Sequence, residues 1–121
     1  MQPRVDYRRY APDAVKSMLA LEKYIAESGL DPKLVHLVKM RASQINGCAY
    51  CLDMHSIDAR AAGEFEQRLY TLEAWRETPF FTDRERAALA WTESLTPHRA
   101  NPRPRRRLRR REKAFHRERN R

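Results

Sequence analysis

Each of the three glycines in this 121-residue chain stands where an apolar helical pattern stops. A residue in the left-handed conformation ends many helices, and glycine adopts that conformation without a steric penalty. The pattern therefore predicts helix ends at Gly29, Gly47 and Gly63. These ends divide the first half of the sequence into segments of ordinary helical length.

Helix start signals precede the predicted segments. Pro12 opens the first pattern, and Asp31 with Pro32 can cap and open the second. Thr82 and Glu85 match the capping box, in which each side chain accepts a hydrogen bond from the other residue's backbone amide. No segment of useful length alternates with period two, so the predicted fold class is all-α, a helical bundle without a sheet.

Apolar residues at helical spacing predict which face of each helix is buried. The predicted inward residues are Val15, Met18, Leu19, Ile25 and Ala26; Leu34, Val38, Ala42 and Ile45; Leu69, Leu72 and Trp75, in a less regular segment over 64–76; and Ala88, Trp91 and Leu95. A helix starting near Cys48 has two apolar faces, so we expect it to be buried on both sides. One face carries Cys48, Cys51, Leu52, His55, Ala59 and Ala62, and the other carries Tyr50, Met54, Ile57 and Ala61.

The net charge of +9 comes from the end of the chain. Residues 97–121 contain 12 of the 25 Lys+Arg and 2 of the 16 Asp+Glu, which leaves 13 basic and 14 acidic residues in 1–96. We therefore predict a near-neutral helical domain over 1–96 and an arginine-rich tail over 97–121. The first residues carry charges with no apolar stretch behind them, and no run approaches the roughly 20 apolar residues of a membrane span. These features predict a cytoplasmic protein that does not enter a membrane.

The only two cysteines occur in the pattern C-x-x-C-x-x-x-H, formed by Cys48, Cys51 and His55. On a helix these positions share one face, so two sulfurs and an imidazole converge. A helix N-terminus favours the thiolate of Cys48, and His55 follows Cys51 at the best spacing for imidazole–thiolate contact. The pattern predicts a redox-active dithiol. One sulfur would attack an oxidant to give a sulfenic acid, and the other would condense with it and release water.

The cysteine pair and the histidines also fit other interpretations. A C-x-x-C pair can be half of a zinc site, but a structural site needs four ligands and no second cysteine pair exists, so we expect no metal. Two inert buried cysteines are a further alternative. A lone histidine such as His36 is more often a surface or core residue than a catalyst.

The stretch from Leu37 to His55, which reads LVKMRASQINGCAYCLDMH, closely resembles the core of the carboxymuconolactone decarboxylase-like family. More narrowly, it resembles the alkylhydroperoxidase D (AhpD)-like branch, which carries the cysteine pair. The resemblance extends over residues 1–96, including the segment from Phe80 to Trp91.

This resemblance implies a thiol-dependent peroxidase that assembles as a homo-oligomer, commonly a trimer or a hexamer. It implies that Cys51 attacks the peroxide, that Cys48 resolves the sulfenic acid and that His55 belongs to the proton relay. His36 stands where the family often has a glutamate, and it could relay a proton without supplying the same negative charge. No cofactor is implied, and an external dithiol must reduce the disulfide.

The tail departs from the family, whose members continue after Leu95 and Thr96 with further helices. Back-translated and shifted by one nucleotide, residues 101–121 can encode a proline-acid helix start and an amphipathic pattern that resembles the family's next helix. We therefore favour a frameshift in the gene or its sequence over a genuine basic tail. Sequencing the locus separates the two, because an intact frame with no family-like extension in the shifted frame would exclude the frameshift.

Three functions are thus open from the sequence. The main hypothesis is an AhpD-like peroxidase that reduces hydrogen peroxide and organic hydroperoxides. The alternative is a redox-responsive or dithiol-exchange protein without efficient turnover. The third is a nucleic-acid-binding protein acting through residues 97–121, which would show salt-dependent binding that is lost when those residues are deleted.

Overall fold

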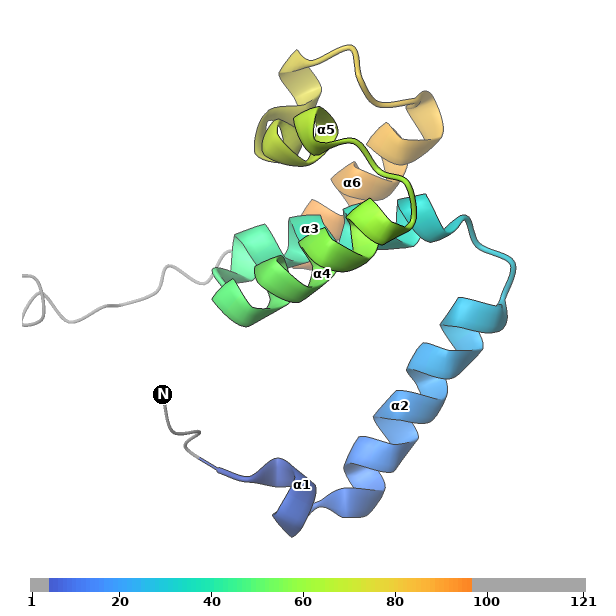
Figure 1. Ribbon diagram of the computed structural model, residues 1–121, viewed down its shortest axis with the longest axis vertical. Helices are drawn as coiled ribbons and strands as arrows, with labels where there is room; N and C mark the ends of the chain where they lie inside the picture. The colour runs from blue at the N-terminus through green and yellow to red at the C-terminus, as the bar shows by residue number, and fades with distance from the viewer. Residues whose placement is uncertain (1–4, 97–121) are drawn as a thin grey trace, which may run out of the picture.

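The computed structural model describes residues 5–96, which form helices joined by short loops (Figure 1). In chain order the helices are α1 (Tyr7–Tyr10), α2 (Pro12–Glu27), α3 (Pro32–Asn46), α4 (Ala49–Ala61), α5 (Glu66–Tyr70), the 3₁₀-helix η1 (Leu72–Glu77) and α6 (Asp83–Leu95). No strand occurs within the described residues, so the predicted all-α fold class is confirmed. The tail and the frameshift hypothesis fall on residues 97–121, outside the described part of the chain.

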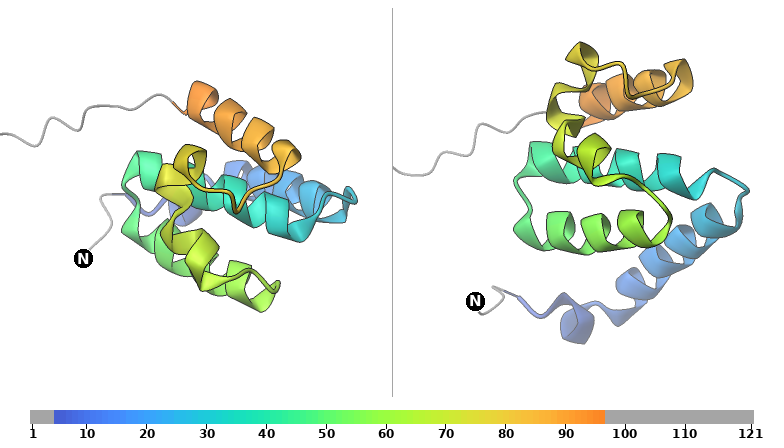
Figure 2. Two further views of the ribbon diagram at one scale, coloured as in Figure 1. Left: turned by 90° about the horizontal axis from the view of Figure 1, so that it is seen from above. Right: turned by 45° about the horizontal axis from the view of Figure 1, so that its top comes forward.

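The central helix of the structure is α3, which packs against α4 on one side and against α6 on the other (Figure 2). The segment containing α5 and η1 connects α4 to α6, and η1 contacts α3. The core between these elements consists of Leu37, Met40, Ala59, Leu69, Leu72, Trp75, Phe81 and Leu89. The cysteine-bearing helix α4 is therefore held directly against the best-buried part of the chain.

The predicted helix boundaries agree with the structure. Gly29, Gly47 and Gly63 all have positive φ angles, of 81°, 61° and 86°, as left-handed helix ends require. The Asp31 side chain accepts a hydrogen bond from the Lys33 amide at 2.9 Å, which caps α3. The capping box at the start of α6 is also present.

The less regular segment over 64–76 is split into α5 and η1. Leu69, Leu72 and Trp75 are all buried, as predicted. They are spaced three residues apart, and a 3₁₀-helix brings residues at i and i+3 to the same side. Ala74 departs from helical geometry, with φ −104° and ψ 29°. The tighter turn keeps the apolar side chains facing the core.

The predicted buried stripe of α3 was wrong in phase. The buried residues are Leu37, Met40 and Ser43, while the residues of the predicted stripe (Leu34, Val38, Ala42 and Ile45) are only half-buried. A helix covered on two sides by α4 and α6 is buried most deeply along the line between its neighbours. A pattern that assumes one buried face misses that line.

Three further burial predictions were wrong. In α2, Met18 is 72% exposed and Leu19 is 64% exposed, and the helix has no buried residue. The second apolar face of α4 is exposed, and so are Trp91 and Leu95 of α6, where Leu89 and Thr92 are buried instead. The reason is that α2 runs away from the other helices (Figure 1) and that nothing in the described chain covers the outer face of α4.

A partly buried network of ion pairs joins α5 to α6. The Arg68 guanidinium binds Glu64 at 2.7 Å and Glu85 at 2.6 Å, and it also donates to the Phe80 carbonyl. Burial alone would raise the pKa of Glu85, but the hydrogen bonds from Arg68 and from the Thr82 amide hold that pKa below its ordinary value. The stabilisation that these hydrogen bonds to Glu85 provide is fully present when the pH lies above the ordinary carboxyl pKa of 4.5. It is lost as the pH falls through the lowered pKa of Glu85 in the folded protein.

None of the helices over residues 5–96 combines the length and the apolar character that crossing a membrane requires.

We predict that Arg68→Ala lowers the free energy of unfolding by about 3 kcal/mol, because the Glu64 side chain, which is 1% exposed, would lose its partner. Urea unfolding followed by circular dichroism measures this change. Arg84→Ala, at an exposed position of α6, is the matched control and should change stability by less than about 0.5 kcal/mol. Equal effects of the two substitutions would contradict the assigned role of the network.

Candidate active site

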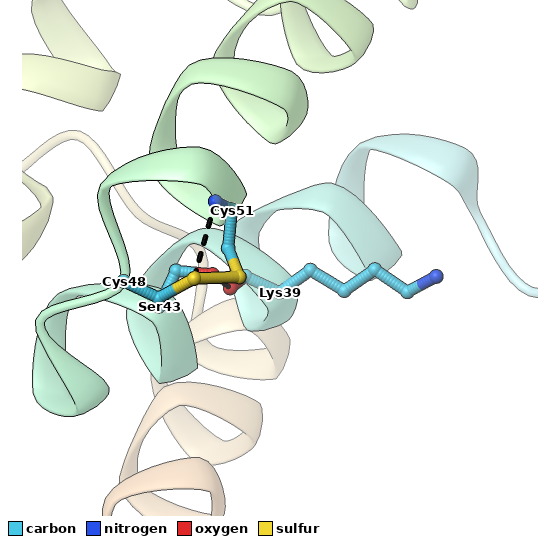
Figure 3. Close-up of a disulfide and its surroundings, with 4 residues drawn as sticks. All are labelled: Lys39, Ser43, Cys48 and Cys51. Carbon is cyan, nitrogen blue, oxygen red and sulfur yellow. Dashed lines mark hydrogen bonds between the residues drawn. A yellow bond between two sulfur atoms is a disulfide. The ribbon is translucent and has the colours of Figure 1, made fainter. Parts of the chain in front are cut away.

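The site is built where the chain passes from α3 to α4. Gly47 ends α3 in the left-handed conformation, and the Cys48 amide then donates to the Ser43 carbonyl at 3.1 Å. Cys48 is the N-cap of α4, and its Sγ accepts a hydrogen bond from the Cys51 amide at 3.3 Å (Figure 3). The sulfur thus takes the place of the oxygen atom that usually caps a helix.

Cys48 and Cys51 are joined by a disulfide, with an S–S distance of 2.13 Å and a Cα–Cα distance of 5.3 Å. That Cα separation lies within the ordinary range for a disulfide, and the first turn of α4 provides it. Both residues are half-buried. The prediction that the two sulfurs can form a bond within one helical turn is therefore confirmed.

His55 lies one turn after Cys51 on α4 and is half-buried, as the shared face predicts. His36 lies on α3 and is half-buried as well. The Nδ1 atoms of both imidazoles are buried without a hydrogen-bond partner among the described residues. A buried ring nitrogen without a partner costs free energy, and it keeps its capacity to form a hydrogen bond.

The environment of His55 favours a neutral imidazole. Burial and then the nearby Lys39 ammonium are the main causes that lower the pKa of His55 from 6.5, while Asp58 opposes the shift. Since the lowered pKa lies below neutrality, His55 is available to accept a proton at pH 7. The chain thus places a proton acceptor one turn from a cysteine.

Two nearby residues were missed by the sequence analysis. Ser43 is 5% exposed, and its hydroxyl donates to the Lys39 carbonyl at 2.6 Å while its own carbonyl accepts from Cys48 (Figure 3). Lys39 lies one turn before Ser43, and its ammonium meets Glu22 of α2. Ser43 stands within the family-like stretch, but no spacing rule relates Lys39 to Glu22, because they come from different helices.

The described residues contain no cluster of three or more His, Cys, Asp or Glu side chains arranged to hold a metal ion. Cys48 at the N-cap of α4 and Cys51 and His55 within α4 are all half-buried, and His36 is half-buried on the neighbouring helix α3. The chemical role of each residue remains the prediction made above.

The chain is similar to known proteins over most of its described residues. Residues 12–94 match the carboxymuconolactone decarboxylase family. The chain is 47% identical over 96 residues to the uncharacterized protein YdfG of Bacillus subtilis (strain 168), and 36% identical over 72 residues to the uncharacterized protein YnjA of Escherichia coli (strain K12). These alignments cover 79% and 58% of this chain, and 65% and 40% of the two relatives.

A solved structure has the same fold. The protein of unknown function ATU0492 from Agrobacterium tumefaciens, described as a candidate antioxidant defence protein AhpD, superposes with a TM-score of 0.74 at 42% identity. The match covers 85% of this chain and 70% of that one. The chain therefore spans just under two thirds of the Bacillus relative and adopts the AhpD-like helical fold, and it belongs to the carboxymuconolactone decarboxylase family.

Proposed function

We propose that this protein is a thiol-dependent peroxidase that reduces hydrogen peroxide and organic hydroperoxides through the Cys48–Cys51 dithiol. The observation that carries the proposal is the disulfide at the first turn of α4, on the same helix face as a half-buried His55. The likeness to a structure described as a candidate antioxidant defence protein supports it.

In the first step, His55 takes the proton of the Cys51 thiol and leaves a thiolate. The thiolate sulfur attacks one peroxide oxygen, and the O–O bond breaks. Cys51 becomes a sulfenic acid, while the departing oxygen takes a proton from the imidazolium and leaves as an alcohol or as water. His36, on the neighbouring helix, is proposed to take part in moving this proton.

In the second step, the sulfur of Cys48 attacks the Cys51 sulfur. The S–S bond forms, the S–O bond breaks, and the hydroxyl group leaves as water with the Cys48 proton. Capping of α4 by Cys48 supports this role, because the amide of Cys51 and the helix N-terminus stabilise negative charge on that sulfur. An external dithiol then returns two electrons and two protons to the pair. The reaction is proposed to take place in the cytoplasm.

Peroxide consumption by the purified protein with dithiothreitol tests this function. We expect turnover in the wild type, and a fall of at least about 100-fold in Cys51→Ser, because the attacking nucleophile is removed. Cys48→Ser, first reduced and then freed of dithiothreitol, should consume about one equivalent of peroxide and then stop, because the sulfenic acid has no resolving partner.

A different outcome would favour the alternative function. If the folded protein forms and exchanges its disulfide but shows no cysteine-dependent peroxide turnover, the peroxidase proposal fails. The protein would then be a dithiol-exchange protein, and the presence of His36 in place of an acidic residue would be the first suspected cause.

We further propose that copies of the chain assemble into a homo-oligomer, a trimer or a hexamer. Exposed apolar faces support this, because they are unusually extensive for a monomer. On α2 they include Met18, Leu19, Leu21 and Tyr24, and on α4 they include Tyr50 and Ile57.

We predict that Ile57→Glu dissociates this assembly, because a charge would replace an apolar side chain that is 62% exposed in the single chain. Sedimentation equilibrium measures the mass of the wild type and of the variant. Arg84→Glu, at an exposed position of α6, should leave the mass unchanged. A wild-type protein that sediments as a monomer would contradict the proposed assembly.

A further inference from the structure

The helix α2 reaches the redox site through one ion pair. The Lys39 ammonium of α3 binds the Glu22 carboxylate of α2, although α2 has no buried residue. The Lys39 side chain is 30% exposed and that of Glu22 is 54% exposed. Lys39 runs away from the disulfide along α3 to make this contact (Figure 3). The pair lies on the side of α3 that also carries His36, one turn earlier.

Charged groups on three helices influence the protonation of His55. Lys39 and His36 of α3 lower its pKa, whereas Asp58 of α4 and Glu22 of α2 raise it. An ammonium ion next to an imidazole disfavours a second positive charge, whereas a carboxylate favours one. Glu22 therefore opposes Lys39 in two ways: it neutralises the ammonium directly, and it adds a negative charge near the imidazole.

We propose that Glu22 is a positioning residue of the redox site, which holds and neutralises the Lys39 ammonium so that His55 can accept the proton of Cys51. This inference rests on the proposed peroxidase function for its consequence, but the protonation of His55 can be measured without any turnover. The inference gives α2 a role in the redox site, although α2 lies outside the motif that contains the cysteines.

The chemistry of the proton step explains why such a residue is needed. When His55 takes the proton, a neutral thiol and a neutral imidazole become a thiolate on Cys51 and an imidazolium on His55, and the Lys39 ammonium disfavours that imidazolium. His36 cannot compensate, because an imidazole carries either no charge or a positive one. Of the groups that influence the pKa of His55, only Glu22 and Asp58 are acidic, and within the described residues only Glu22 also binds Lys39. The two charges of the pair act on His55 in opposite directions, because Lys39 lowers the pKa of His55 and Glu22 raises it.

The competing explanation is that the pair merely tethers α2. Exposed ion pairs contribute little to stability, typically below about 1 kcal/mol. A tether would therefore leave the titration of His55 unchanged when the carboxylate is removed and the fold is kept. A positioning role predicts a shift, so the titration separates the two explanations.

The test is an NMR titration of the His55 imidazole in the full-length reduced protein. We expect Glu22→Gln to lower the His55 pKa by roughly half a unit, less than a close buried charge would because the pair is partly exposed. Lys39→Gln should raise it by a similar amount. The double variant should return close to the wild-type value, because the two opposite charges leave together. Circular dichroism verifies that each variant is folded.

The matched control is Glu27→Gln, which removes another exposed carboxylate of α2, one that pairs with Lys23 at 3.9 Å. It should leave the His55 pKa unchanged. If Glu22→Gln behaves like this control, or if Lys39→Gln does not move the pKa, the inference is wrong.

The same variants separate this inference from the proposed function. If the protein turns over peroxide, Glu22→Gln should lower kcat/KM at neutral pH by about threefold, which is the half-unit shift converted at tenfold per unit. The double variant should recover the loss. If the protein has no peroxidase activity, the shifts in the NMR titration still decide whether Glu22 sets the charge around His55.

Discussion

The packing of α4 against α3 is the contact on which the rest of the structure depends. It determines which face of α4 is turned inward, and that face carries both cysteines and His55. The contact is fixed at one end by Gly47, whose left-handed backbone brings the start of α4 back beside α3. It is fixed along its length by the fully buried Leu37 and Ala59. The chemistry of the site is thus placed by backbone geometry and apolar packing before any charge is considered.

The helix dipole and nearby charged side chains then influence the protonation of the cysteines and of His55. The helix start stabilises negative charge on Cys48, and burial keeps His55 neutral at pH 7. Lys39 and Glu22 act on His55 with opposite signs.

Much of this arrangement was predictable from local sequence. Helix ends at Gly29, Gly47 and Gly63, the capping box at Thr82 and the disulfide reach of C-x-x-C all depend on residues within one or two turns, where backbone rules are strong. The inner face of α4 followed from the same helical period.

What failed depended on other parts of the molecule. The period of α3 alone could not reveal that two helices cover it, so its buried line was misplaced. The apolar residues of α2 and Trp91 were expected inside because an apolar pattern marks a face of a helix without showing whether another helix covers it. The contact of Glu22 with Lys39 was invisible because only the fold brings residues 17 positions apart on different helices together.

The central claim is that Cys51 is the sulfur that peroxide oxidises. Trapping the sulfenic acid tests it most directly: Cys48→Ser and Cys51→Ser are reduced, treated with one equivalent of hydrogen peroxide in the presence of dimedone, and analysed by mass spectrometry. The account predicts that dimedone labels Cys51 in Cys48→Ser and that Cys48 in Cys51→Ser remains largely unlabelled. Equal or stronger labelling of Cys48, or no labelling of Cys51 in a folded protein, would contradict it.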